Sequence, residues 1–264
     1  MKTTHFQICF VDEGTANYNL DKKSLCMLNR DNKYAITTEN LLRKYYGLGG
    51  EFEKYVLKNT RESYVYEPLL CCYPDDFKLV KIPKINEANK DILDVMNHSL
   101  NLNEISPYIN KNIYFILQNY DESLKQIFVT IFIKIPHNEI LIKEHPSYNV
   151  VGILNDEIDF SSVYIDKRKN AFIFEALGQI INFNAKILIT SFSSAAFTLK
   201  YLYDYEPKVI FLYKLTKSYS SLVPHFDIMV DKLKAIYQNP DNIYVPATIN
   251  EFTKILETVN NFDT

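Results

Sequence analysis

Hydrophobic and polar residues alternate through the second half of the chain in a rhythm that predicts strands and helices in turn. Most short apolar runs of strand character are followed by a longer segment whose apolar residues have helical spacing. The expected strands are Ile113–Leu117, Ile140–Ile142, Val163–Ile165, Ile187–Ile189, Val209–Leu212 and Ile243–Val245. The expected helices are Ser123–Lys134, Ala171–Ile181, Ala195–Tyr203, Phe226–Tyr237 and Ile249–Val259. Strands that alternate with helices form βαβ units, so this half of the chain predicts a parallel sheet in an α/β fold.

The first 111 residues carry a weaker pattern. The apolar run Phe6–Val11 predicts a strand, and the alternating run Phe77–Ile82 predicts an edge strand. Residues 83–111 are rich in Asn and Asp and suit a linker with one helix near residues 88–100. We therefore expect a partial N-terminal domain and linker over residues 1–111, and a complete Rossmann-like domain over residues 112–264.

Composition narrows the class of protein. The chain has 264 residues, of which 47% are hydrophobic and 23% charged, which is the balance of a soluble globular protein. A net charge of −3 gives no reason to expect a nucleic-acid partner. The four cysteines lack metal-ligand spacing and indicate reduced thiols in a cytoplasmic protein. No apolar run approaches the ~20 residues that span a bilayer, so membrane association would be peripheral.

A His-Pro pair follows the expected strand Ile140–Ile142. Pro146 fixes its own φ and pushes His145 into an extended conformation. The imidazole would then stand at the carboxyl end of a strand, where open α/β sheets bind their ligands. The alternative is a structural turn without a chemical role.

Polar residues also follow two other expected strands. Ser193 and Ser194 come after the strand Lys186–Thr190 and directly before a helix, where they could equally be an ordinary N-cap. Asp12, Glu13 and Gly14 follow the first strand, and the glycine permits a tight turn that aims a carboxylate above the sheet. A solvated turn is the simpler interpretation of the acidic pair. No Gly-x-Gly-x-x-Gly fingerprint is present, so no nicotinamide or flavin cofactor is expected.

These features occur in the order and spacing of a known family. The four motifs are Asp12-Glu13-Gly14, His145-Pro146, Phe174-Glu175-Ala176-Leu177-Gly178 and Ser193-Ser194. Together they resemble those of bacterial sialyltransferases, in particular the lipooligosaccharide sialyltransferases of glycosyltransferase family 52, to which the capsular polysialyltransferases are related in motif logic. The resemblance covers residues 6–18 and about 112–215.

The resemblance implies a GT-B architecture of two Rossmann-like domains facing a cleft. It implies CMP-sialic acid as donor, a galactose-terminated surface glycan as acceptor, inversion at the anomeric carbon, and neither metal nor cofactor. The enzyme would act in the cytoplasm, and peripheral attachment to the inner membrane face and oligomerisation are left open. Only eleven residues precede the acidic motif, so we expect a shortened N-terminal domain.

The resemblance also implies roles for the motif residues. His145 would bond to the phosphate of CMP and stabilise or protonate the leaving group. Ser193 and Ser194, with the free N–H groups of the following helix, would bind that phosphate. Glu175 would accept hydrogen bonds from the ribose, although it could instead only complement a helix dipole. Within the matched motifs, Gly14 and Pro146 also belong to the donor side.

The acceptor hydroxyl needs a general base, and Asp12 or Glu13 would supply it. The sequence leaves open which of the two does so. It also leaves two alternatives to the whole interpretation. One is a GT-B glycosyltransferase that uses another nucleotide sugar, and the other is a truncated, non-catalytic remnant that binds a nucleotide.

Overall fold

The computed structural model describes residues 8–11, 60–68, 78–85, 94, 102–118, 120–145, 149–166 and 174–259. The chain divides into two compact units, Met1–Pro83 and Lys84–Thr264. This boundary lies earlier in the chain than the one expected between residues 111 and 112. The helix α6 (Leu102–Ile109), which falls in the expected linker, therefore belongs to the second unit.

The described part of the first unit is a parallel sheet. Its strands are β1 (Ile8–Val11), β2 (Thr60–Val65) and β3 (Lys78–Lys81), in the order β1-β2-β3. Both pairings are parallel. The strand expected over residues 6–11 and the edge strand expected over residues 77–82 are confirmed by β1 and β3. In β3 the two lysines are exposed and the apolar residues between them are half-buried, as an edge strand requires.

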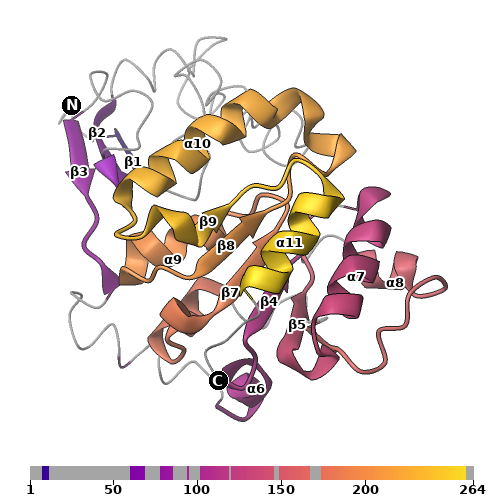
Figure 1. Ribbon diagram of the computed structural model, residues 1–264. Helices are drawn as coiled ribbons and strands as arrows, with labels where there is room; N and C mark the ends of the chain where they lie inside the picture. Colours follow the sequence, from indigo (N-terminus) through magenta and orange to yellow (C-terminus); the bar gives the residue numbers. More distant parts are fainter. Residues whose placement is uncertain are drawn as a thin grey trace, which may run out of the picture. The chain divides into compact units, whose positions relative to one another are not determined.

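The second unit contains a six-stranded sheet in which every pairing is parallel. The strands are β4 (Ile113–Ile116), β5 (Ile140–Lys143), β6 (Tyr164–Asp166), β7 (Ile187–Thr190), β8 (Lys208–Phe211) and β9 (Ile243–Tyr244). Their order across the sheet is β6-β5-β4-β7-β8-β9. Figure 1 labels the strands β5, β4, β7, β8 and β9 of this sheet. Counted from β4, this is the order 3-2-1-4-5-6 of Rossmann-like sheets. The α/β fold with a parallel sheet is thus confirmed.

Helices connect these strands. The α-helices are α7 (Ser123–Lys134), α8 (Val150–Leu154), α9 (Ala195–Tyr203), α10 (Val223–Ile236) and α11 (Ile249–Val259). Short 3-10 helices are η3 (His137–Glu139), η4 (Phe174–Gln179), η5 (Phe183–Ala185), η6 (Lys217–Leu222) and η7 (Pro240–Asn242). The bounds of α7, α9 and α11 are those expected from the sequence.

The helix expected over residues 171–181 differs from the structure. Its described part is the 3-10 helix η4, which ends at Gln179. Phe174 and Leu177 are both buried, and their spacing of three residues suits the three residues per turn of a 3-10 helix. Gly178 packs tightly against α9, because a Cβ atom at this position would lie 2.5 Å from the ring of Tyr203.

Apolar residues bury both faces of the six-stranded sheet. On one face, Ile113 and Phe115 of β4 share a core with Phe128 of α7 and Phe252 of α11. Figure 1 shows these two helices side by side over this face. On the other face, the ring of Tyr114 packs against Phe174 and Phe183, with centroids 5.8 and 5.3 Å apart. Burial on both sides explains why the strands are continuous apolar runs.

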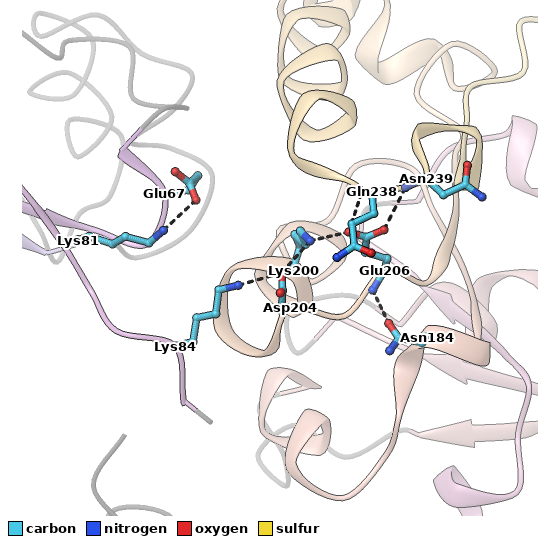
Figure 2. Close-up of polar contacts among 9 residues, drawn as sticks. All are labelled: Glu67, Lys81, Lys84, Asn184, Lys200, Asp204, Glu206, Gln238 and Asn239. Carbon is cyan, nitrogen blue, oxygen red and sulfur yellow. Dashed lines mark hydrogen bonds and ion pairs between the residues drawn. The ribbon is translucent and has the colours of Figure 1, made fainter. Parts of the chain in front are cut away.

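A polar cluster forms at the C-terminal end of α9 (Figure 2). Lys200 pairs with Asp204 at 2.7 Å, and Lys84 pairs with the same carboxylate at 2.8 Å. Glu206 accepts a hydrogen bond from Lys200 at 2.5 Å and another from the backbone N–H of Gln238 at 2.8 Å. The cluster therefore ties Lys84, the first residue of the second unit, and the segment after α10 to the end of α9.

Among the residues that the structure describes, no helix has both the length and the apolar character needed to cross a membrane.

Candidate functional site

The carboxyl ends of four parallel strands lie side by side in the second unit. Lys143 of β5, Ile116 of β4, Thr190 of β7 and Phe211 of β8 are in register. The strand order reverses between β4 and β7, since later strands are added outward in opposite directions from these two. Open α/β sheets bind ligands at such a switch point, outside the carboxyl ends of the strands. The segments that follow β4, β5, β7 and β8 therefore form the candidate site.

His145 lies two residues beyond the end of β5, and its side chain is exposed. The two residues before it are each tied to a different element. Lys143 forms an ion pair of 2.9 Å with Asp166 at the end of β6. The carboxylate of Glu144 accepts a hydrogen bond of 2.8 Å from the backbone N–H of Val151 in α8. These contacts fix the backbone that leads to His145.

The ion pair beside His145 is buried. The side chain of Asp166 is 1% exposed and that of Lys143 is 12% exposed. Tyr108 of α6 donates a hydrogen bond to the same carboxylate, and its carbonyl accepts a hydrogen bond of 2.5 Å from Tyr114. Buried charges are tolerated when they are paired and hydrogen-bonded in this way. The pair therefore fixes the ends of β5 and β6 against α6.

Ser193 and Ser194 lie between β7 and α9 and are half-buried. The Ser193 hydroxyl accepts a hydrogen bond of 3.3 Å from the backbone N–H of Ala195, which is long for an N–H to O bond. Ser194 occupies the N-cap position of α9, but its side chain makes no capping hydrogen bond. Helix capping thus describes Ser193 only weakly and does not describe Ser194 at all.

Phe192 anchors the same loop through contacts of its ring and of its main chain. Its ring is buried and stacks on Phe226 with a centroid distance of 3.7 Å. The rings of Phe211 and Tyr213 also contact it, at 5.5 and 5.6 Å. Gln118, just beyond β4, binds the Phe192 main chain twice: its Nε2 donates to the carbonyl at 2.7 Å and its Oε1 accepts from the N–H at 3.0 Å.

Asp121 links the segment after β4 to the segment after β8. Its carboxylate accepts hydrogen bonds from the backbone N–H of Ser123 at 2.9 Å and of Ser218 at 2.8 Å. The hydroxyls of both serines donate to it as well. Burial alone would raise the pKa of Asp121, but these hydrogen bonds outweigh burial and lower this pKa to about 2. Asp121 is therefore ionised at neutral pH.

The structure brings two of the predicted motifs to one edge. His145 follows β5 and Ser193-Ser194 follows β7, and only β4 lies between these strands. Neighbouring strands are about 4.8 Å apart, so the two strand ends are roughly 10 Å from each other. Side chains that extend from two backbones this far apart can reach one phosphate group between them.

The other predicted residues are placed only in part. The backbone of Glu175 lies in η4, before β7, while its side chain is outside the described residues. Asp12, Glu13, Gly14 and Pro146 also lie outside the described residues. In the sequence the acidic pair directly follows the last residue of β1.

Several residues of the edge were not predicted from the sequence. They are Gln118, Asp121, Asp166, Ser218 and Tyr219. The pattern Asp121-x-Ser123 before a helix is a recognisable start signal, and it could have indicated an ordered loop there. Gln118 is a polar residue directly after a buried strand, but its contact with Phe192 depends on β4 lying next to β7.

No three His, Cys, Asp or Glu side chains of the described residues gather closely enough to hold a metal ion. The fold and this edge define an α/β protein with polar residues at the switch point between β4 and β7. No protein-family model matches the sequence, and no similar curated protein was found.

Proposed function

We propose that the chain is an inverting sialyltransferase that moves sialic acid from CMP-sialic acid to a galactose-terminated glycan of a bacterial surface. The observation that carries the proposal is that His145 and Ser193-Ser194 follow the two strands on either side of β4, at the carboxyl edge of the sheet. Nucleotides bind at this edge in folds with this strand order. The resemblance of the motifs names the nucleotide as CMP.

The loop before α9 supports a phosphate site. The first N–H groups of a helix attract anions, and a hydroxyl that is not used for capping can add a further hydrogen bond. Ser194 meets this condition, because its side chain makes no capping bond to α9. By the same resemblance, Glu175 would accept hydrogen bonds from the ribose.

The chemistry requires groups on two sides of the donor. The acceptor hydroxyl oxygen attacks the anomeric carbon while the bond from that carbon to the phosphate oxygen breaks. The bonding electrons leave with CMP, and a hydrogen bond or proton from His145 stabilises the phosphate. The hydroxyl proton passes to the carboxylate of Asp12 or Glu13. A base and an acid on opposite sides of the carbon give inversion.

The proposed architecture is GT-B. The second unit would bind the donor, and the first unit would bring the acidic pair. The first unit supports this assignment because its described strands also form a parallel sheet, and the acidic pair follows β1.

The donor nucleotide can be tested by thermal unfolding with CMP, UDP or GDP. A ligand at a hundred times its Kd stabilises a protein by roughly 2.7 kcal/mol, which raises Tm by roughly 5–10 °C for a chain of this size. We expect CMP alone to do so. Stabilisation by UDP or GDP but not CMP would indicate another nucleotide sugar. If no nucleotide raises Tm, the proposed donor site is wrong.

The role of His145 can be tested by His145→Ala. Transfer of sialic acid should fall by about 10²–10⁴-fold, as expected for loss of an acid catalyst, and Tm should change much less than for a buried residue because the side chain is exposed. A matched control is His137→Ala, at η3 before the amino end of β5 and thus at the opposite edge of the sheet. Near-normal transfer by His145→Ala would remove this residue from the mechanism.

A further inference from the structure

The side chain of Gln118 connects the two loops on either side of the switch point. It is the second residue after β4, and its amide bonds to both main-chain groups of Phe192, which is the second residue after β7. One side chain thus satisfies a donor and an acceptor of the neighbouring loop. The side-chain amide of an ordinary surface glutamine forms these hydrogen bonds with water instead. The pairing therefore locks together the two loops between which ligands bind in this fold.

A second set of contacts orients the Gln118 amide. The hydroxyl of Tyr219 donates to the Gln118 Oε1 at 3.1 Å. Tyr219 follows Ser218, whose backbone N–H and hydroxyl are held by Asp121. A backbone N–H can only donate, so the Gln118 atom that faces the Phe192 N–H is the carbonyl oxygen of the amide. The side chain is therefore fixed in the orientation that offers its NH₂ group to the Phe192 carbonyl.

The loop that contains Phe192 is consequently held in two ways. Gln118 holds its main chain, and the stack on Phe226 holds its ring. Ser193 and Ser194 are the next two residues. Their positions above the sheet are thus set before any ligand arrives, and a rigid loop loses less conformational freedom on binding than a mobile one.

We propose that Gln118 is a positioning residue that preorganises Ser193 and Ser194 for the phosphate of a bound nucleotide. The inference rests on the proposed function, in which these serines hold the phosphate of CMP. Gln118 itself does not touch the ligand. It acts through the Phe192 peptide, which it keeps in one orientation directly before Ser193 and Ser194.

The test is calorimetric titration of the full chain with CMP for the wild type, Gln118→Glu and Gln118→Ala. Gln118→Glu keeps the shape and the acceptor but replaces the donor with an oxygen that repels the Phe192 carbonyl. Loss of hydrogen bonds of this kind corresponds to about a tenfold weaker CMP affinity for either variant. Tyr219→Phe removes the hydrogen bond to the Gln118 Oε1 and should weaken CMP binding about threefold.

The matched control is Gln126→Glu, which makes the same chemical change on the exposed surface of α7. It should bind CMP as the wild type does. Amide hydrogen exchange of residues 191–195 provides a second measurement, and we expect it to speed up in both Gln118 variants but not in the control.

The outcomes separate the inference from the proposed function. If the wild type binds CMP and Gln118→Glu binds it equally well, the positioning role is wrong and the nucleotide site stands. The same holds if the variants lower Tm while CMP affinity below the transition is unchanged, since Gln118 would then only stabilise the fold. If the wild type does not bind CMP, the proposed function fails and the inference fails with it.

Discussion

The Asp121 carboxylate connects two loops that are far apart in the sequence. It receives hydrogen bonds from Ser123 at the start of α7 and from Ser218 in η6. These loops follow β4 and β8, which lie on either side of β7. One charged residue therefore holds the loops on either side of the segment that contains Ser193 and Ser194. Its contribution to the free energy of unfolding depends on the carboxylate remaining ionised.

Asp121→Asn should destabilise the protein by about 1–2 kcal/mol at pH 7, after allowance for solvent that still reaches the site. An asparagine can accept hydrogen bonds at one of the two oxygen positions but presents an NH₂ group to the donors at the other. The folded pKa of about 2 lies below the ordinary value of 3.8. The stabilisation is therefore fully present above about pH 4 and is lost as the pH falls through about 2.

Urea unfolding of the wild type and Asp121→Asn at pH 7, 5 and 3 would measure this dependence. The difference between their unfolding free energies should narrow at the lowest pH. The control is Asp156→Asn, an exposed carboxylate after α8, which should change stability by less than about 0.5 kcal/mol. An Asp121→Asn effect that is constant from pH 7 to pH 3 would mean that charge is not its source.

At the scale of elements, the two serines at the start of α9 should contribute to CMP affinity but little to stability. Ser194→Ala removes a hydroxyl without a capping bond, so the free energy of unfolding should not change. Ser193→Ala removes one long hydrogen bond and should cost less than the ~1 kcal/mol typical of a lost N-cap. The double variant should nevertheless bind CMP at least about tenfold more weakly, because it removes both hydroxyls that are proposed to bind the phosphate.

Melting curves and CMP titrations of the single and double variants would decide between the two roles. A loss of stability near 1 kcal/mol with unchanged CMP affinity would show that the serines only cap α9. Thr198→Ala offers a comparison within the same helix, since its hydroxyl donates a hydrogen bond to the carbonyl of Ala195.

The sequence predicted the elements whose local pattern of apolar and polar residues is sufficient to identify them. Helices α7, α9 and α11 are long, amphipathic or apolar, and clearly bounded, so their limits were predicted correctly. Helix α6 was missed because it contains Pro107, a residue that normally interrupts a helix. The five-residue α8 is too short to show a helical period. The 3-10 form of η4 depends on its packing against α9, which no local pattern reveals.

The residues of the candidate site also differ in how far the sequence alone could predict them. Placing His145 and Ser193-Ser194 at strand ends required only the local pattern and the rule for α/β sheets. The contacts of Gln118, Asp121 and Asp166 join segments whose strands are neighbours only in the folded sheet. Such pairings depend on strand order, which the sequence does not display.

At the scale of the whole molecule, the position of the boundary between the units can be tested with fragments. Residues 84–264 should unfold cooperatively as an independent unit, because the core of this unit is formed within it. Residues 112–264 lack α6 and therefore Tyr108, whose hydroxyl bonds to Asp166 and whose carbonyl accepts from Tyr114. Loss of a buried aromatic side chain typically costs about 3–5 kcal/mol.

Urea unfolding of the two fragments would give this difference directly. The shorter fragment should be less stable by several kcal/mol or should fail to fold. Equal stability of the two fragments would support the boundary between residues 111 and 112 instead. The variant Tyr108→Phe in the longer fragment isolates the hydroxyl contact from the loss of the helix.

The central place of β4 also affects how the chain folds during synthesis. Its partners are β5, made shortly afterwards, and β7, from which it is separated by about seventy residues, or roughly 4–14 s at the speed of a ribosome. During that interval the half-sheet of β4, β5 and β6 has an open edge whose residues, Ile113–Ile116, are all buried in the final protein. Open apolar edges bind other strands readily. The nascent chain is therefore most exposed to aggregation, and most dependent on chaperones, just before β7 leaves the ribosome.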